Sequence, residues 1–593
     1  MPGGGWRPDR VVNSMRVLLV DPLDSAESGI WASQRWDRIV DLGQGGAQTY
    51  ARWAGDFQCP VTPLNSLRNG LADLRRIRDL LDRGRGRLTD KYGVDWWEVL
   101  SILWHGELET ITLLQRLANE LGPKGEVHVS RPGFHFDVLR KLQAPVVAPS
   151  GKAETRGPGH YLRLSRKLSA QQIADIFGDK FDPGYQFRGR FARRRQPQSG
   201  PVVLLPSAYV NVSRGGLAYA NTLTDDTFLL VTTRRSAWID NLPRNVSAAW
   251  LSSYASLTGR TKENAEMLSR WQSLRRELRA LPEFDMLDRL GYLDSFSSRL
   301  GHGLEIRDAW QNVFEREPVR AVLCLDDSNP YTRIPLFLAR DRGVPSIACH
   351  HGALDSRYGF KRCYADVLWA KGKMEKDYLV RLCGVPKEKV EMGAPAMPAS
   401  WSATDHSEGQ TFRPYVVFFS EMYEVLGGRA EEFYRDVLPP LADLARGSGR
   451  TLVVKLHPAE SERDRSNMLQ RLLSAEQLAA TRMVSGSITP ELLAKTWAGV
   501  TVLSSVAMEC AVHGIPCFLC KWLEYWPYGY VDQFIRFGVG IGLNNPEEIA
   551  KIPQYVQEFA PSAEVRQNCW QPVEKQRWRE ILSSSPRVCT AAR

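Results

Sequence analysis

Residues 451–460 read TLVVKLHPAE, and residues 499–519 read GVTVLSSVAMECAVHGIPCFL. Each segment begins as a short apolar run and ends abruptly in small, polar or cationic residues. Runs of this kind are typical of strands buried in a parallel sheet. We therefore expect an α/β fold class in which the carboxyl ends of these strands carry polar side chains.

The first segment places Lys455 and His457 where its strand stops, because Pro458 cannot continue the hydrogen-bonded ladder. The second segment ends in Ser504 and Ser505, which precede a helix and a further strand. A strand–helix–strand unit of this kind puts the serine hydroxyls and unpaired backbone N–H groups at the start of the helix, which favours phosphate binding.

Glu509 lies four residues after Ser505, one turn into the expected helix and on the same side, where its carboxylate suits the two hydroxyls of a ribose. Together with the cations Lys455 and His457, these residues predict a nucleotide site. The alternative is structural: a serine pair that serves only as an N-cap, and a His-Pro pair that forms only a turn.

This pattern resembles the HP and SS motifs of bacterial capsule enzymes: Lys-x-His-Pro at one strand end, then Ser-Ser at another, a helix and Gly-x-Pro. That group contains the polysialyltransferases, the capsular Kdo transferases and the CDP-glycerol glycerophosphotransferases. The resemblance implies a GT-B fold, with two Rossmann-like doubly wound lobes and a cleft between them. It also implies that His457, Ser504 and Ser505 hold the phosphate of a cytidine nucleotide donor. The helix is similar to that of the UDP-GlcNAc 2-epimerases as well, which implies a ribose role for Glu509.

A length of 593 residues predicts two large lobes. We assign residues 1–400 to an N-terminal, acceptor-side Rossmann-like lobe with insertions, and residues 410–560 to a C-terminal lobe that binds the nucleotide-sugar. Residues 396–413 are polar and mark the linker. In GT-B enzymes the last helices return to the first lobe, and we expect the same of residues 561–593.

Two further expectations concern the first lobe. DLGQGG at residues 41–46 follows a strand, but we expect no helix of the right kind to begin there and therefore no dinucleotide site. Residues 246–316 are expected to be helical.

The first lobe also carries a candidate catalytic edge. Asp327 follows one buried strand and His351 follows the next, so both side chains are expected at the same edge of the sheet. Either one suits the base that removes a proton from an acceptor hydroxyl. In the resemblance to the 2-epimerases, Asp327 takes the acidic place of their Gly-Asp-Thr loop. The acidic-acidic-Gly motif of the polysialyltransferases has no clear copy, because Ser328 follows the two aspartates. The alternative is a helix-capping Asp and a hydrogen-bonded loop histidine.

The formal charge of +10 and a pI near 9.0 indicate an acidic partner. Basic residues gather at residues 75–87 and 188–195, but no RNA-binding or zinc-finger signature accompanies them, so nucleic acid is not expected. We expect a glycan or lipid-linked glycan acceptor and the anionic inner-membrane surface as partners.

Cys517 and Cys520 form the only close cysteine pair, with no second pair to complete a metal site, so no metal is expected. No run of eighteen apolar residues and no apolar core near the N-terminus is present. These features predict a cytoplasmic protein that is peripheral at the inner membrane.

Together, these features predict a metal-independent GT-B glycosyltransferase without a cofactor, which moves a sugar from a nucleotide donor to a glycan acceptor. The pathway predicted from the resemblance is bacterial surface polysaccharide biosynthesis, of capsule or lipopolysaccharide. Two alternatives stay open: a UDP-GlcNAc 2-epimerase-like enzyme, and a non-catalytic glycan-binding protein on a GT-B scaffold. The sequence leaves open the sugar, the nucleobase, the acceptor, the linkage, the stereochemical outcome and the oligomeric state.

Overall fold

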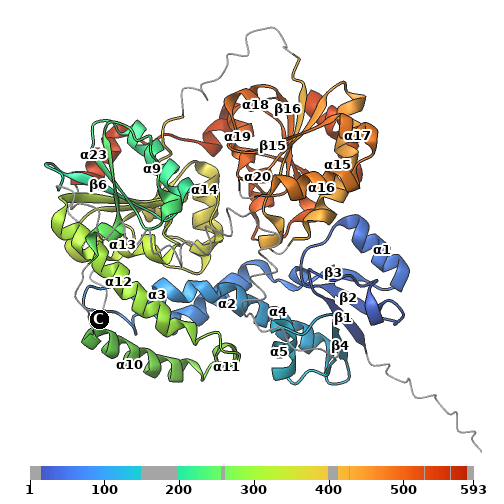
Figure 1. Ribbon diagram of the computed structural model, residues 1–593, viewed down its shortest axis with the longest axis horizontal. Coiled ribbons are helices and arrows are strands. Elements are labelled where there is room, and N and C mark those ends of the chain that lie inside the picture. Colours follow the sequence, from blue (N-terminus) through green and yellow to red (C-terminus); the bar gives the residue numbers. More distant parts are fainter. Residues whose placement is uncertain are drawn as a thin grey trace, which may run out of the picture.

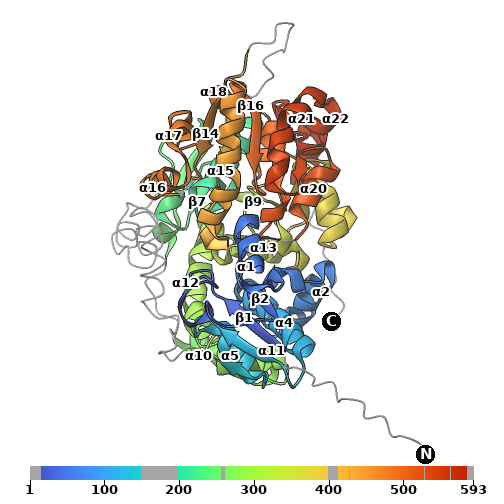
Figure 2. The same ribbon diagram turned by 90° about the vertical axis from the view of Figure 1, so that its right-hand side faces the viewer.

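The computed structural model describes residues 15–147, 197–255, 261–397, 412–426, 428–458, 460–526, 528–560 and 562–583. Within these ranges the chain forms three parallel β-sheets covered by helices, as Figure 1 and Figure 2 show. The predicted α/β class with two doubly wound lobes is confirmed, and a third doubly wound sheet accompanies them. None of the helices in these ranges combines the length and apolar content that a membrane crossing needs.

The first sheet has five strands in the order β3-β2-β1-β4-β5. Its strands are β1 (Arg16–Val20), β2 (Arg38–Asp41), β3 (Val61–Pro63), β4 (Glu126–Val129) and β5 (Val146–Val147). Its helices are α1 (Ala47–Phe57), α2 (Gly70–Asp82), α3 (Trp96–Leu100), α4 (His105–Leu121) and α5 (Phe134–Lys141).

The second sheet has seven strands in the order β12-β11-β10-β9-β6-β7-β8. Its strands are β6 (Val202–Ser207), β7 (Phe228–Thr232), β8 (Val246–Trp250), β9 (Val319–Cys324), β10 (Ser346–Cys349), β11 (Val367–Ala370) and β12 (Val390–Met392). Its helices are α9 (Val210–Thr222), α10 (Thr261–Leu278), α11 (Pro282–Arg289), α12 (Ser295–Arg316), α13 (Pro330–Arg342) and α14 (Lys373–Asp377). The expectation of helix from residue 246 was wrong at its start, because Val246–Trp250 pairs with β7 as an edge strand.

The third sheet has six strands in the order β15-β14-β13-β16-β17-β18. Its strands are β13 (Tyr415–Phe419), β14 (Thr451–Lys455), β15 (Thr481–Val484), β16 (Thr496–Thr501), β17 (Cys517–Cys520) and β18 (Ile541–Leu543). Its helices are α15 (Ala430–Gly447), α16 (Glu462–Leu472), α17 (Ala475–Ala479), α18 (Pro490–Ala494), α19 (Val506–Val512), α20 (Tyr530–Arg536) and α21 (Ile552–Glu558).

The range 1–400, assigned above to one lobe, thus contains two separate sheets. Most of the expected linker, residues 398–411, and the basic segment 188–195 lie outside the described residues.

A glycine-rich loop attaches the five-stranded sheet to the six-stranded one. Contrary to our expectation, a helix does follow this loop, since α1 begins at Ala47 directly after Gly46. The backbone N–H of Gly46 donates to Glu432 Oε2 (3.0 Å), and that of Ala47 donates to Asp436 Oδ2 (2.5 Å), both on α15. A Cβ on Gly46 would lie 2.9 Å from Asp436 Oδ2, so the close approach requires glycine here.

Arg429, just before α15, reinforces this attachment. Its guanidinium donates to Asp41 Oδ1 at the end of β2 (2.9 Å) and to the backbone carbonyl oxygens of Asp21, Pro22 and Asp24 after β1. Arg429, Glu432 and Asp436, at the start of α15 in the third sheet, therefore occupy the carboxyl edge of the five-stranded sheet.

Helices of the five-stranded sheet also pack against those of the seven-stranded one. Figure 1 shows α3 lying beside α12 and α13, and α4 contacts α11. The ring of Trp96 lies over Gly303 of α12, where a Cβ would be 2.4 Å from the ring. The buried carboxylate of Glu98 accepts from Arg333 Nη2 on α13 (2.7 Å) and from the N–H of Arg362 (2.9 Å).

Of the last helices, α23 (Lys575–Ser583) lies on the seven-stranded sheet, whereas α22 (Ala563–Cys569) packs against α14 and against α19 of the third sheet. Trp578 packs against Trp369 of β11 with ring centroids 5.7 Å apart, and its indole N–H donates to Asp226 (2.5 Å). Helix α23 therefore belongs to the core of the second sheet, although it follows the third sheet in the chain.

Candidate functional site

The carboxyl edge of the six-stranded sheet gathers the residues predicted to bind a nucleotide. Strand β14 ends at Lys455, and β16 ends at Thr501, just before Ser504 and Ser505. Strand β13 lies between them in the sheet. The Lys-His half and the Ser-Ser half of the motif therefore follow two strands that are separated in the sheet by one strand, β13.

Lys455 is buried, and its ammonium donates to the carbonyl oxygens of Leu456 and Gly486, both at 2.6 Å. Burial lowers the pKa of this lysine, while the carboxylates of Glu460 and Glu509 act to raise it. Lys455 thus fixes the segment after β15 and presents positive charge toward Glu509.

His457 follows on the same strand end, and its backbone N–H donates to Glu460 Oε2 at 2.7 Å. Burial, with the Lys455 charge, lowers the pKa of the imidazole, so the ring is neutral at neutral pH. Glu460 also accepts from Ser420 Oγ and from Arg465 Nε, both at 2.8 Å. Sequence reasoning missed Glu460, although it lies within the quoted motif.

The serine pair differs from an ordinary helix cap. Ser505 immediately precedes α19 but has helical dihedral angles (φ −59°, ψ −13°) and makes no side-chain cap hydrogen bond. The Ser504 hydroxyl accepts from the N–H of Val506 over a long 3.4 Å. Ser505 is exposed, so its hydroxyl faces solvent rather than the helix it precedes.

Glu509 lies within electrostatic reach of Lys455. Burial raises the pKa of its carboxyl group to about 7, and the Lys455 charge opposes that rise. The structure therefore brings the predicted cation and the predicted ribose-binding carboxylate together.

A second acid that the sequence analysis missed, Glu421, supports this edge from the end of β13. It accepts from Thr501 Oγ1 (3.0 Å), from the N–H of Leu503 (3.0 Å) and from the hydroxyl of Tyr525 (2.6 Å). These bonds hold the end of β16, and so the serine pair, in one position. Tyr525 is buried and belongs to the core.

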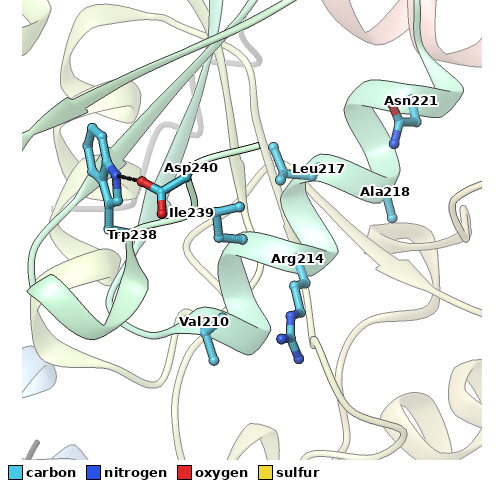
Figure 3. Close-up of a pocket in the computed structure, with 8 residues that line it drawn as sticks. All are labelled: Val210, Arg214, Leu217, Ala218, Asn221, Trp238, Ile239 and Asp240. Carbon is cyan, nitrogen blue, oxygen red and sulfur yellow. Dashed lines mark hydrogen bonds between the residues drawn. The ribbon is translucent and has the colours of Figure 1, made fainter. Parts of the chain in front are cut away.

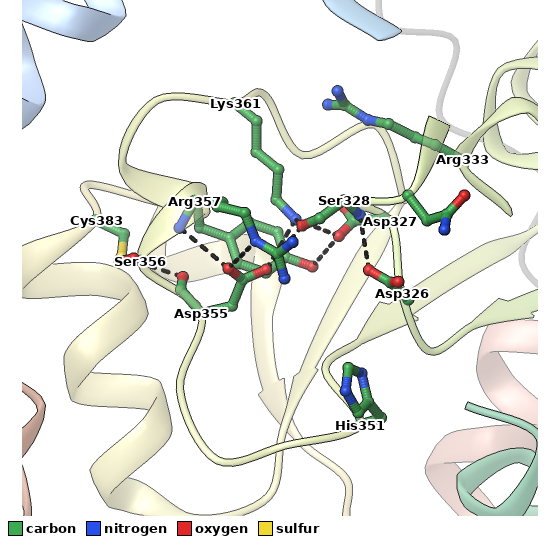
Figure 4. Close-up of polar contacts among 12 residues, drawn as sticks. Asp326, Asp327, Ser328, Arg333, His351, Asp355, Ser356, Arg357, Lys361 and Cys383 are labelled. Carbon is green, nitrogen blue, oxygen red and sulfur yellow. Dashed lines mark hydrogen bonds and ion pairs between the residues drawn. The ribbon is translucent and has the colours of Figure 1, made fainter. Parts of the chain in front are cut away.

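The first-lobe edge carries Asp326 and His351 (Figure 4), and Tyr209 lies between them. The Tyr209 hydroxyl donates to Asp326 Oδ2 at 2.8 Å and lies 3.3 Å from His351 Nδ1. Burial lowers the pKa of His351, although the Asp326 carboxylate opposes this. The acid that shares a hydrogen-bond partner with His351 is therefore Asp326, and the sequence analysis had singled out Asp327.

Asp327 lies in a buried charge cluster on the other side of the loop. Its Oδ1 accepts from the Tyr358 hydroxyl (2.7 Å) and from Lys361 Nζ (2.5 Å). Lys361 also contacts Asp355 Oδ2 at 3.1 Å, and Asp355 pairs with Arg357 at 2.7 Å. Figure 4 shows His351 on the Asp326 side, away from Lys361. The positive charge of Lys361 therefore compensates the negative charge of the Asp327 carboxylate within the protein.

Lys371, also missed, fixes the loop that carries the two histidines. Its ammonium donates to the carbonyl oxygens of His350 and Gly352, the latter at 2.6 Å. The backbone N–H of Lys371 donates to Glu375 Oε2 (2.6 Å), whose pKa burial raises to about 7. No local sequence signal pointed to this lysine, because its partners are backbone atoms about 20 residues earlier.

Arg214 joins the two edges. Its Nη1 lies 3.4 Å from the hydroxyl of Ser487, next to the Gly486 carbonyl that holds Lys455. Arg214 lies on α9 of the seven-stranded sheet. The described part of the chain contains no group of three His, Cys, Asp or Glu side chains with the arrangement of a metal site.

Comparison with protein-family models and with curated proteins gives no match. Among solved structures, the chain is similar to the UDP-GlcNAc 2-epimerase from Methanocaldococcus jannaschii, with 11% identity and a TM-score of 0.41 over 65% of this chain and 100% of that chain. It is similar to MurG from Acinetobacter baumannii, with 11% identity and a TM-score of 0.37 over 65% and 99%. The calicheamicin glycosyltransferase CalG4 has 13% identity and a TM-score of 0.35 over 65% and 94%. Identities and scores this low assign neither a family nor an activity to this chain.

Proposed function

We propose that this chain is a GT-B glycosyltransferase that moves a sugar from a nucleotide donor to a glycan acceptor in bacterial surface polysaccharide biosynthesis. The observation that carries the proposal is the approach of Lys455 to Glu509 next to the exposed Ser505, whose hydroxyl caps no helix. A cation, a carboxylate and an available hydroxyl are the groups that a nucleoside diphosphate needs. An ordinary capped helix and turn need none of them.

In this proposal the donor lies at the edge of the six-stranded sheet. Ser504 and Ser505 donate hydrogen bonds to its phosphates, and Glu509 accepts from the ribose hydroxyls. His457 is neutral before binding, but a phosphate dianion beside it raises its pKa, so the ring gains a proton as negative charge develops on the leaving phosphate. Lys455 adds charge from its fixed position. The mechanism uses neither a metal nor a cofactor.

His351 is the better candidate for the base that deprotonates the acceptor. Its lowered pKa keeps the ring neutral and able to take a proton at neutral pH. The hydrogen-bonded pair of Tyr209 and Asp326 orients it and favours the protonated form that follows. Asp327 is then a positioning residue, because its carboxylate is already paired with Lys361.

The acceptor in this proposal is a glycan or lipid-linked glycan. The formal charge of +10 favours attachment to the anionic cytoplasmic face of the inner membrane, where a lipid-linked acceptor is available.

The proposal is tested by thermal unfolding of the purified protein with CMP, CDP, UDP or GDP. A ligand at 100 times its Kd stabilises the native state by about 2.7 kcal/mol and so raises Tm by several degrees. We expect one nucleotide to raise Tm, and Ser505→Ala to lose at least half of the shift. Ser298→Ala, at an exposed serine on α12, is the matched control and keeps the full shift.

A nucleotide shift that survives Ser505→Ala and His457→Ala contradicts the site. No shift with any of the four nucleotides contradicts the proposed donor. Turnover of a nucleotide-sugar without any acceptor points instead to a 2-epimerase-like enzyme.

A further inference from the structure

An open hollow of about 430 Å³ lies along α9 of the seven-stranded sheet, next to the first-lobe edge (Figure 3). One wall is the outer face of α9, and the other is the segment that follows β7. The lining combines apolar and polar side chains: Val210, Arg214, Leu217, Ala218, Asn221, Trp238, Ile239 and Asp240. Arg214, Asn221 and Asp240 are exposed.

Trp238 is held in one orientation at this hollow. Its indole N–H donates to Asp240 Oδ1 at 3.0 Å. Its ring packs edge-on against Trp250 of β8, with centroids 5.4 Å apart and planes at 82°. A tryptophan that is fixed and half-buried, with the Asp240 carboxylate beside it, matches a sugar ring, which has an apolar C–H face and polar hydroxyl edges.

Arg214 gives the hollow its charge and its position. The guanidinium matches a carboxylate or phosphate group through paired N–H donors. It also contacts Ser487 of the third sheet, one residue from the Gly486 carbonyl that holds the ammonium of Lys455. Two hydrogen bonds, joined by the peptide link between Gly486 and Ser487, therefore connect the hollow with the proposed donor site.

We propose that this hollow binds a short segment of an anionic glycan acceptor, with Trp238 against one sugar ring and Arg214 paired with an acidic group farther along the segment. Asp240 and Asn221 bond hydroxyls at the two ends of the segment. The role of this glycan as the acceptor rests on the proposed function, but the binding of an acidic sugar in the hollow is a separate property. The acceptor class is then a glycan that carries carboxylate or phosphate groups.

The test measures binding of the full chain, at 150 mM salt, to three immobilised oligosaccharides. They share one backbone and end in glucose, in glucuronate or in glucose 6-phosphate. We expect the glucuronate or the phosphate form to bind at least ten-fold tighter than the neutral one, and the stronger of the two identifies the acidic group. Trp238→Ala is expected to weaken binding of all three, whereas Arg214→Met removes only the preference for the acidic forms.

Phe412→Ala and Arg579→Met are the controls, because both replace exposed side chains outside the hollow. Binding to none of the three sugars, equal binding to all three, or acidic-sugar binding that both hollow variants retain, overturns the proposal. The nucleotide Tm shift is measured on the same variants. If the wild-type protein binds no nucleotide but does bind the anionic sugar, the proposed donor site is refuted and the proposed sugar site in the hollow is retained.

Discussion

Glu509 holds its proton up to about pH 7, because burial disfavours the carboxylate. Between its unfolded pKa of about 4.5 and its folded pKa the native state binds more protons than the unfolded chain, so the free energy of unfolding falls as pH rises. Glu509→Gln is always neutral and lacks this loss. We expect the variant to gain stability relative to wild type from pH 5 to pH 8.

Urea unfolding of both proteins at the two pH values measures this difference. Glu375 and Glu524, whose pKa burial also raises to about 7, titrate in both proteins and cancel. A difference in unfolding free energy that is the same at both pH values contradicts the buried, protonated Glu509.

Asp327 and Lys361 form a buried ion pair, so removing one partner leaves an uncompensated charge or dipole. We expect Asp327→Asn to lower the free energy of unfolding by about 3 kcal/mol. Asp327→Asn combined with Lys361→Met is expected to cost less than the sum of the two single changes, because the pair is removed together. Urea unfolding of the four proteins gives the coupling energy, and additive losses contradict it.

A second readout separates this structural role from catalysis. At a temperature where the Asp327→Asn protein stays folded, turnover per folded molecule should remain within about ten-fold of wild type, whereas His351→Ala should lose at least about 10²-fold. A large loss in Asp327→Asn with the fold intact would restore it as the base.

For single residues, the sequence indicated where a side chain lies in the fold better than it indicated which atoms that side chain contacts. Lys455, His457, Ser504, Ser505 and Glu509 were located because apolar runs mark where parallel strands stop. The carbonyl oxygen that binds Lys455 belongs to Gly486, 31 residues later, and no local pattern encodes such a contact. Asp326 and Asp327 are neighbours whose side chains leave the loop in opposite directions, and only the folded loop decides which one reaches Tyr209.

At the scale of elements, we expect the packing of α23 on the second sheet to depend mainly on Trp578. Trp578 is 2% exposed, packs on Trp369 and bonds to Asp226. We expect Trp578→Ala to lower the free energy of unfolding by about 3 to 5 kcal/mol, the usual cost of deleting a buried tryptophan. Arg579→Ala, an exposed neighbour on the same helix, should change it by less than 0.5 kcal/mol.

Chemical unfolding measures both variants, and amide exchange in β11 reports where the loss falls. Faster exchange in β11 is expected for Trp578→Ala alone. A loss below 1 kcal/mol contradicts the packing of α23 as part of the second sheet's core.

Two elements were predicted wrongly for physical reasons. Helix α1 fully buries only Thr49 and Trp53, and its start depends on the carboxylates of Glu432 and Asp436 from α15. Strand β8 has an alanine-rich sequence that favours helix, but pairing with β7 overrides this preference. In both cases the deciding contact comes from a distant part of the chain.

In the whole molecule, the five-stranded sheet is held to the third sheet by charge. Arg429→Met removes the bonds to Asp41 and to three carbonyl oxygens, and Asp436→Asn weakens the acceptor for the α1 N–H groups. We expect the double variant to exchange amide hydrogens in α1 at least ten-fold faster than wild type. Arg446→Met, at an exposed arginine on α15, is the control.

Hydrogen exchange followed by mass spectrometry gives the rates by segment. Unchanged protection of α1 in the double variant would mean that apolar packing, rather than these bonds, holds the sheet in place. Faster exchange throughout the third sheet would show global destabilisation instead of loosened docking.

The sequence predicted an α/β protein with doubly wound lobes, and the structure agrees. It did not reveal that residues 16–147 form a sheet of their own. Apolar runs identify strands, but the choice of neighbour in a parallel sheet depends on contacts between segments far apart in the chain.

The filled edge of the five-stranded sheet has a consequence for how the molecule divides. The N–H donors of the loop before α1 already bond to Glu432 and Asp436. In this sheet, side chains of the same chain therefore occupy the place where a doubly wound sheet can bind an anion. A fragment that begins after residue 147 would expose those two acids and Arg429 without their partners. The three sheets are therefore expected to fold as a single unit.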